Sequence, residues 1–151
     1  ARKLRNILCN NRPYDRKSCT NNSCKICPLL VTENKDCEVK NVVYKVKCRI
    51  CDQIYIGETC RRAHDRLGEH LRYSTFPLTP SNVNQAFAIH YTTLHAGLSP
   101  DLEFEILKIE SNTVRRKIAE AMFILKFNPS INKREELDNI KRFLISSTRS
   151  V

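Results

Sequence analysis

The residues best suited to chemistry lie between Asn41 and His70. Tyr44 and Tyr55 flank a Cys-x2-Cys pair, and Arg66 precedes His70 by four residues, a spacing that puts both on one face of a helix. A guanidinium can hold phosphate oxygens, and an imidazole can transfer a proton. A phenol has a pKa near ~10 and is a poor base unless cations lower that pKa, as the surrounding Arg and Lys residues are expected to do. Together these residue types indicate chemistry on a phosphodiester.

Such chemistry also needs a carboxylate for a metal ion, and Glu120 is the best candidate. It is the single acid in the apolar run IAEAMFIL of a predicted helix. An acid there is costly unless it faces a cleft or meets a cation, and one carboxylate with several waters is a typical Mg²⁺ arrangement. The pattern equally allows Glu120 to point to solvent on a polar stripe with Arg116.

The chain has eight cysteines, which could form a secreted disulfide framework or bind metal. The lack of a signal-like opening stretch, the two Cys-x2-Cys pairs and the well-patterned helices favour zinc. Cys48 and Cys51 are followed by His90 and His95, whose spacing is typical of zinc-binding histidines at a helix end. We expect these four residues to form one zinc site; the alternative is that both histidines are ordinary surface or core residues.

A second zinc site is predicted in the polar, basic segment 1–38, which has too little apolar surface to fold alone. Its ligands would be four cysteines: Cys19, Cys24, Cys27 and Cys37. Cys9 and Cys60 are left over, and either could replace one of the proposed ligands.

The net charge of +10 suits a phosphate backbone, although a soluble basic domain without a nucleic-acid role is also possible. Arg61, Arg62 and Arg66 are the predicted DNA contacts. No apolar run approaches the ~20 residues of a membrane span, so no membrane partner is expected. The chain begins with alanine and its only methionine is Met122, so we expect it to be a piece of a longer protein.

Hydrophobic periodicity predicts an α+β fold with a small, mainly antiparallel three-stranded sheet flanked by helices. The predicted strands cover 42–47, 54–56 and 102–106, and the predicted helices cover 59–73, 81–95, 112–128 and 134–147. Gly57 is expected to end the second strand, and Ser111 or Asn112 to cap the third helix. The predicted apolar face of that third helix consists of Val114, Ile118, Ala121, Met122 and Leu125. The loop-rich zinc segment 1–38 would precede the main domain 39–151.

Several of these motifs, taken in order, resemble those of the GIY-YIG nuclease family over roughly residues 41–132. They are Val42-Val43-Tyr44, Tyr55-Ile56-Gly57, Arg66, His70, Glu120 and Phe127-Asn-Pro-Ser-Ile-Asn132. The inserted Cys-x2-Cys, the Tyr-Ile-Gly-Glu-Thr continuation and the later histidine pair resemble more narrowly the endonuclease domain of Penelope-like retroelements. The cysteines upstream resemble the linker that precedes that domain. The first motif departs from the family because it lacks the glycine.

The resemblance implies a divalent-metal-dependent DNA endonuclease. Its residue roles would be Tyr44 as general base or water-orienting group, Tyr55 as support, Arg66 for the transition state, His70 for proton transfer or phosphate binding, Glu120 for one Mg²⁺ or Mn²⁺, and Asn132 as a brace. It further implies nicking of double-stranded nuclear DNA to expose a 3′ end that primes reverse transcription. The partners would be the reverse transcriptase part of the same polypeptide and its template RNA. The alternatives are a non-catalytic zinc-stabilised nucleic-acid-binding module and a homing or repair nuclease of the same family.

Overall fold

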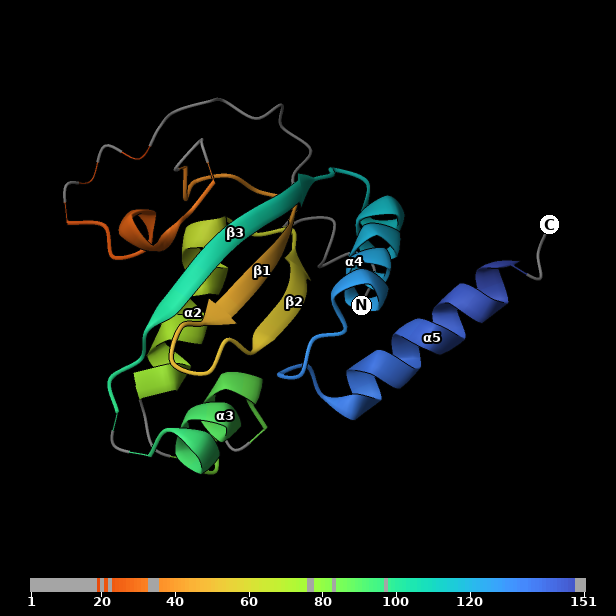
Figure 1. Cartoon of the computed structure of the whole chain (residues 1–151). Helices are drawn as coiled ribbons and strands as arrows, with labels where there is room; N and C mark the ends of the chain where they lie inside the picture. Colours follow the sequence, from red (N-terminus) through yellow and green to blue (C-terminus); the bar gives the residue numbers. More distant parts are fainter. Residues whose placement is uncertain are drawn as a thin grey trace.

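The computed structural model describes residues 19, 21, 23–32, 36–75, 78–82, 84–96 and 98–148. Its centre is a three-stranded antiparallel sheet made of β1 (Val42–Cys48), β2 (Ile54–Thr59) and β3 (Leu102–Ile109), in the order β2-β1-β3. Five further elements surround it: η1 (Cys27–Leu29), α2 (Ala63–Thr75), α3 (Ala86–Leu94), α4 (Thr113–Phe127) and α5 (Arg134–Thr148). The predicted α+β class and antiparallel sheet are confirmed (Figure 1).

Alternate residues of the central strand β1 pack into two different cores. Tyr44 packs with Leu67 of α2 and Phe87 of α3, whereas Val43 packs with Ala119 of α4. Because successive side chains of a strand point to opposite faces, α2 and α3 cover one face of the sheet and α4 covers the other. Figure 1 shows the same division, with α5 beside α4. The helices are therefore held by apolar burial on both faces of a sheet only three strands wide.

Strand β2 continues through Gly57 to Thr59, so the expectation that Gly57 ends the strand was wrong. Gly57 lies opposite Tyr44 in the β1–β2 register. A Cβ at Gly57 would lie 2.6 Å from Tyr44 Oη and 2.8 Å from the Tyr55 ring. Glycine is required here because two tyrosine rings occupy the space that a Cβ would need. The strand does not turn at this residue.

Two helices begin later than the periodicity predicts. Thr59 still pairs with Val42 in the sheet, and α2 begins only at Ala63, whose N–H donates to Val39 O at 2.7 Å. The helix α3 begins at Ala86, because residues 79–82 form a turn in which Asn82 N donates to Thr79 O at 3.0 Å. In both cases residues that the apolar pattern assigns to the helix form backbone hydrogen bonds in a strand or a turn instead.

The helix α4 is capped as predicted, but it buries a different face. Asn112 Oδ1 accepts a hydrogen bond from Arg115 N at 3.0 Å, which satisfies a donor of the first turn. The predicted apolar face is wrong at three positions, since Val114, Met122 and Leu125 are 59%, 62% and 57% exposed, whereas Ala121 is buried as predicted. The buried residues are Arg116, Ala119, Ala121 and Ile124. The helix is turned this way because Arg116 forms an ion pair with a carboxylate of β2.

The described part of the cysteine-rich segment packs onto the sheet. Leu30 pairs with Phe104 of β3 in a parallel bridge, and Val31 N donates to Phe104 O at 2.9 Å. Ile26 and Cys37 are 2% and 0% exposed within the same apolar core as Tyr44. This segment therefore covers an edge of the sheet and shares the core of the main domain. Among the described helices, none is long and apolar enough to cross a membrane.

Candidate active site and metal centres

The hydroxyl of Tyr44 lies between two side chains of α2. Arg66 Nε donates to Tyr44 Oη at 3.1 Å, and Tyr44 Oη lies 2.8 Å from His70 Nε2. A guanidinium can only donate, so the phenol oxygen accepts from Arg66. With the imidazole proton on Nδ1, the phenol can donate its own proton to His70 Nε2. Because the helix presents residues four apart on one face, both partners reach the same phenol.

Burial keeps both Tyr44 and His70 neutral. Tyr44 is 0% exposed, and desolvation raises its pKa above the ordinary value although the charge of Arg66 acts in the opposite direction. Arg66 thus lowers the pKa of Tyr44 as expected of a neighbouring cation, but burial outweighs this effect and the net shift is upward. Burial, together with the charge of Arg66, lowers the pKa of His70 to about 3. A neutral imidazole carries a lone pair on one ring nitrogen, and when that nitrogen is Nε2 it can accept the phenol proton.

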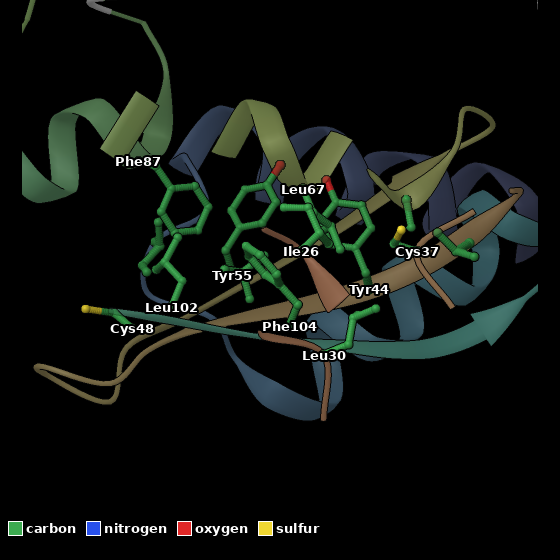
Figure 2. Close-up of a cluster of buried hydrophobic side chains, with 14 of the residues drawn as sticks. Ile26, Leu30, Cys37, Tyr44, Cys48, Tyr55, Leu67, Phe87, Leu102 and Phe104 are labelled. Atoms are coloured by element: carbon green, nitrogen blue, oxygen red, sulfur yellow. The ribbon is translucent and has the colours of Figure 1, made fainter. Parts of the chain in front are cut away.

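A row of rings surrounds this pair. Tyr55 lies 6.4 Å from Tyr44 and 5.2 Å from His70 between ring centroids, and Phe87 lies 4.8 Å from His70. Figure 2 shows Phe87, Tyr55 and Tyr44 along the core beneath α2. The predicted site residues of β1, β2 and α2 are thus brought together, and aromatic rings pack around the phenol and the imidazole.

The three arginines predicted to contact DNA all carry ion pairs. Arg61 donates to Glu69 through two nitrogens at 2.7 and 2.9 Å, and Arg66 Nη1 donates to Glu69 Oε2 at 2.9 Å. Two arginines lower the pKa of Glu69 to about 2, with Arg61 making the larger contribution. The third arginine is Arg62, which is paired with Asp65 and Glu38. Sequence reasoning missed Glu69, although its position beside His70 on the same predicted helix was a usable signal.

Glu120 lies on α4, half-buried, and its negative charge is one of the influences that raise the pKa of Tyr44. Glu120 thus belongs to the helix that covers the sheet face opposite the one covered by α2 and α3. The alternative of a solvent-exposed stripe shared with Arg116 was wrong, because Arg116 is 1% exposed. Its Nε donates to Glu58 Oε2 of β2 at 2.7 Å, and its Nη1 donates to Asn41 Oδ1 at 3.2 Å.

The ion pair between Arg116 and Glu58 was not predicted. Arg116 precedes Ala119 by three residues and Ile124 by eight, so it lies on the stripe that α4 buries. A charged residue on such a stripe requires a partner, and Glu58 follows the Tyr-Ile-Gly motif directly. The pair fastens α4, which carries Glu120, to the strand that carries Tyr55.

Asn132 lies just beyond α4 and pairs with the outer edge of β2. Its Oδ1 accepts from Ile56 N at 2.9 Å, and its Nδ2 donates to Ile56 O at 2.8 Å. Ile131 N donates to Ile54 O at 3.1 Å. These bonds take the place of a neighbouring strand at an edge where unpaired backbone groups would otherwise be left. The amide thus fixes the backbone between Tyr55 and Gly57.

The four predicted ligands of the first zinc site converge on one point. Cys48 and Cys51 come from the tip of the β1–β2 hairpin, where Asp52 has a positive φ of 61°, and His90 and His95 come from α3 and its C-terminus. The sulfur–nitrogen distances are 3.5 Å from Cys48 to His95, 3.6 Å from Cys51 to His90 and 3.3 Å from Cys51 to His95. Tetrahedral zinc with ordinary bond lengths requires about 3.5 Å. The donor set therefore fits zinc.

The second predicted site also forms a cluster. The thiols of Cys19, Cys24, Cys27 and Cys37 lie within 4.8 Å of one another, and the sulfurs of Cys24 and Cys37 are 3.7 Å apart. Two thiolates on tetrahedral zinc lie about 3.8 Å apart. These four thiols can thus hold one zinc ion.

Among the described residues, Cys60 is the one cysteine that belongs to neither cluster. Cys60 is disulfide-bonded, so it does not replace a proposed zinc ligand, and Cys9 lies outside the described residues.

Both groups of predicted zinc ligands adjoin residues that position α2. Cys37 O and Val39 O accept hydrogen bonds, each of 2.7 Å, from the first N–H groups of α2. At the other end, Phe87 lies between His70 and the zinc-site residue His90, with ring centroids 4.8 and 6.5 Å away. The helix with Arg66 and His70 is thus held between the two clusters.

No family model, no curated protein and no solved structure matches this chain.

Proposed function

We propose that this chain is a divalent-metal-dependent DNA endonuclease of the GIY-YIG type, the nicking domain of a Penelope-like retroelement. The observation that carries the proposal is the buried Tyr44 hydroxyl between Arg66 Nε and His70 Nε2, above Gly57. These four residues come from the motifs on which the resemblance rests. Their convergence in one structure is expected of a nuclease site and is not required of a binding module.

In the proposed reaction Tyr44 passes on a proton. Because its pKa is raised by burial, it does not start as a phenolate. It takes a proton from the attacking water while its own proton moves to His70 Nε2, which lies 2.8 Å away and is neutral. The water oxygen bonds to phosphorus, the bond from phosphorus to O3′ breaks, and O3′ takes up a proton from solvent. The product is a 3′-hydroxyl end of the kind that primes reverse transcription.

Arg66 and a metal ion held by Glu120 would stabilise the negative charge that develops in this reaction. The guanidinium of Arg66 already contacts the phenol oxygen and can stabilise negative charge on the phosphate. Glu120 would hold one Mg²⁺ or Mn²⁺, which supplies charge stabilisation for the leaving oxygen when bound. The ion pair of Arg116 with Glu58 keeps α4 against β2, and so sets the position of Glu120.

The two zinc clusters have a structural part in this proposal. Each offers four protein ligands and leaves no position for a substrate, which is typical of structural zinc. The substrate would be double-stranded nuclear DNA, and the partners would be the reverse transcriptase of the same polypeptide and its RNA template. The excess of 26 Lys and Arg over 16 Asp and Glu supports a polyanionic substrate.

A plasmid nicking assay tests the proposal. Supercoiled plasmid should be nicked with Mg²⁺ or Mn²⁺, and neither Glu120→Ala nor Arg66→Ala should nick it while both variants keep the wild-type circular dichroism. The matched control is Arg115→Ala, because Arg115 is exposed and lies on the same helix as Glu120. Undiminished cutting by both site variants would refute the proposal.

A non-catalytic zinc-stabilised nucleic-acid-binding module is the second candidate, favoured by the same two clusters and the same net charge. Duplex binding without metal-dependent nicking would favour it. A homing or repair nuclease of the same family would share the chemistry. A reverse transcriptase upstream in the full gene would exclude it.

A further inference from the structure

Glu69 lies between two guanidinium groups at the outer side of the Tyr44 site. Its Oε1 accepts from Arg61 Nη1 at 2.7 Å, and its Oε2 accepts from Arg61 Nη2 and Arg66 Nη1, each at 2.9 Å. Side-chain exposure increases outward, from the fully buried Tyr44 through Arg66 (26%) to Arg61 (45%). The two arginines thus form an anion site that begins at the phenol and opens to solvent.

The nitrogen atoms that hold Glu69 differ from the one that holds Tyr44. Arg66 uses Nε for the phenol and Nη1 for the carboxylate. An anion that replaced the carboxylate would therefore leave the Arg66 contact with Tyr44 in place. Arg61 presents two nitrogens side by side, a fork that fits a phosphate as well as it fits a carboxylate.

We propose that Arg61 and Arg66 bind one phosphate of duplex DNA and that Glu69 occupies this site in the free protein, so that the incoming phosphate displaces it. This inference rests on the proposed function, because it takes DNA as the substrate. Glu69 is a competitor within the chain, and the fraction of free site depends on how easily its carboxylate leaves. The incoming phosphate would replace the three hydrogen bonds of Glu69 with bonds of similar geometry from the same guanidinium groups.

The same helix offers a matched comparison. Asp65 accepts from Arg62 at 2.9 Å, as Glu69 accepts from Arg61, but Arg62 is paired with Asp65 and Glu38 and not with the Tyr44 network. Asp65→Asn and Glu69→Gln each remove one negative charge from α2 that is paired with arginine, but Arg62 keeps Glu38 as a partner. Only Glu69→Gln opens the site beside Tyr44.

The experiment measures binding of a short fluorescent DNA duplex without added divalent ions and without chelator, so that cleavage is prevented and the zinc clusters stay intact. Wild-type protein, Glu69→Gln, Asp65→Asn and Arg61→Gln are titrated at several salt concentrations. Thermal unfolding checks that each variant is folded. We expect Glu69→Gln to bind about threefold to tenfold tighter than Asp65→Asn, because the phosphate no longer has to displace a carboxylate that is hydrogen-bonded to both arginines.

Arg61→Gln serves as the second variant. It should bind more weakly than wild type, and the slope of log affinity against log salt should fall by about 0.9 in magnitude for one lost phosphate contact. The inference is overturned if Glu69→Gln binds no better than Asp65→Asn, or if Arg61→Gln leaves affinity and salt slope unchanged. Tighter binding by Glu69→Gln with no plasmid nicking by wild type would keep this inference and reject the nuclease. Plasmid nicking by wild type without a difference in binding between Glu69→Gln and Asp65→Asn would keep the nuclease and reject this inference.

Discussion

Tyr44 Oη and His70 Nε2 lie 2.8 Å apart in a buried site, and Arg66 Nε donates to the same phenol oxygen. A neutral His70 with its proton on Nδ1 accepts the phenol proton at Nε2. Tyr44→Phe should therefore lower nicking by about 10²–10⁴, because the proton path is lost while the ring remains. Plasmid nicking rates measure the effect, and Tyr73→Phe, a half-buried tyrosine of the same helix as His70, is the control. Equal rates for wild type and Tyr44→Phe would contradict the proton path.

Gly57 and Gly68 should respond to alanine in opposite directions. Gly57→Ala should lower the free energy of unfolding by about 1–3 kcal/mol, since its Cβ would lie 2.6 Å from Tyr44 Oη. Gly68 lies within α2 with no atom within 4 Å of a Cβ, so Gly68→Ala should raise that free energy by about 0.4–1 kcal/mol. Urea unfolding of both variants provides the measurement. If Gly57→Ala left the free energy of unfolding unchanged, Tyr44 could not lie over this position.

His70 makes a defined contribution to the pH dependence of stability. Its pKa is about 3 in the folded protein and near ~6.5 when unfolded, so the unfolded chain binds more protons between these values. Stability is therefore complete above about pH 6.5 and falls by up to about 1.4 kcal/mol per pH unit below it. His70→Gln keeps an acceptor for Tyr44 and should lose this slope. The measured quantity is the difference between wild-type and variant unfolding free energies from pH 7 to pH 5, which removes contributions common to both. Parallel curves would contradict a neutral, buried His70.

Arg116 should be far more important for stability than its neighbour Arg115. Its side chain is 2% exposed and paired with Glu58 at 2.7 Å, so Arg116→Met should cost about 3–5 kcal/mol by leaving a buried charge without its partner. Arg115→Met, on an exposed side chain, should change stability by less than about 0.5 kcal/mol. Adding Glu58→Gln to Arg116→Met should restore part of the loss. Chemical denaturation of the three variants tests this, and similar costs for both arginines would refute a buried pair.

Elemental analysis should find about two zinc ions per chain, because both clusters have donor distances that match tetrahedral zinc. His95→Ala should lower the content to about one and destabilise the protein, since its ligand set would be incomplete. Cobalt substitution separates the sites, because four thiolates and a mixed set of two thiolates and two imidazoles give different absorption. A content of one zinc ion per wild-type chain, with the cysteines from Cys19 to Cys37 oxidised, would reject the site in the cysteine-rich segment.

The local patterns of the sequence were sufficient for the strands, the class of fold and both sets of zinc donors. Alternation marked β1 and β3, and the spacing of Cys48, Cys51, His90 and His95 indicated one site before any contact was known. These features depend on period and on residue type, which are visible along the chain. The Arg66 and His70 pair was predictable for the same reason, because four residues make about one helical turn.

Three properties were decided only by tertiary packing. The pKa of Tyr44 rises because burial outweighs Arg66, and burial is a sum over residues distant in sequence. The face that α4 buries depends on Glu58 of β2, 58 residues from Arg116. Gly57 is required by a tyrosine of the neighbouring strand rather than by its own backbone. A sequence records which groups exist and how they repeat, whereas their charge states and partners depend on which surfaces lose water together in the fold.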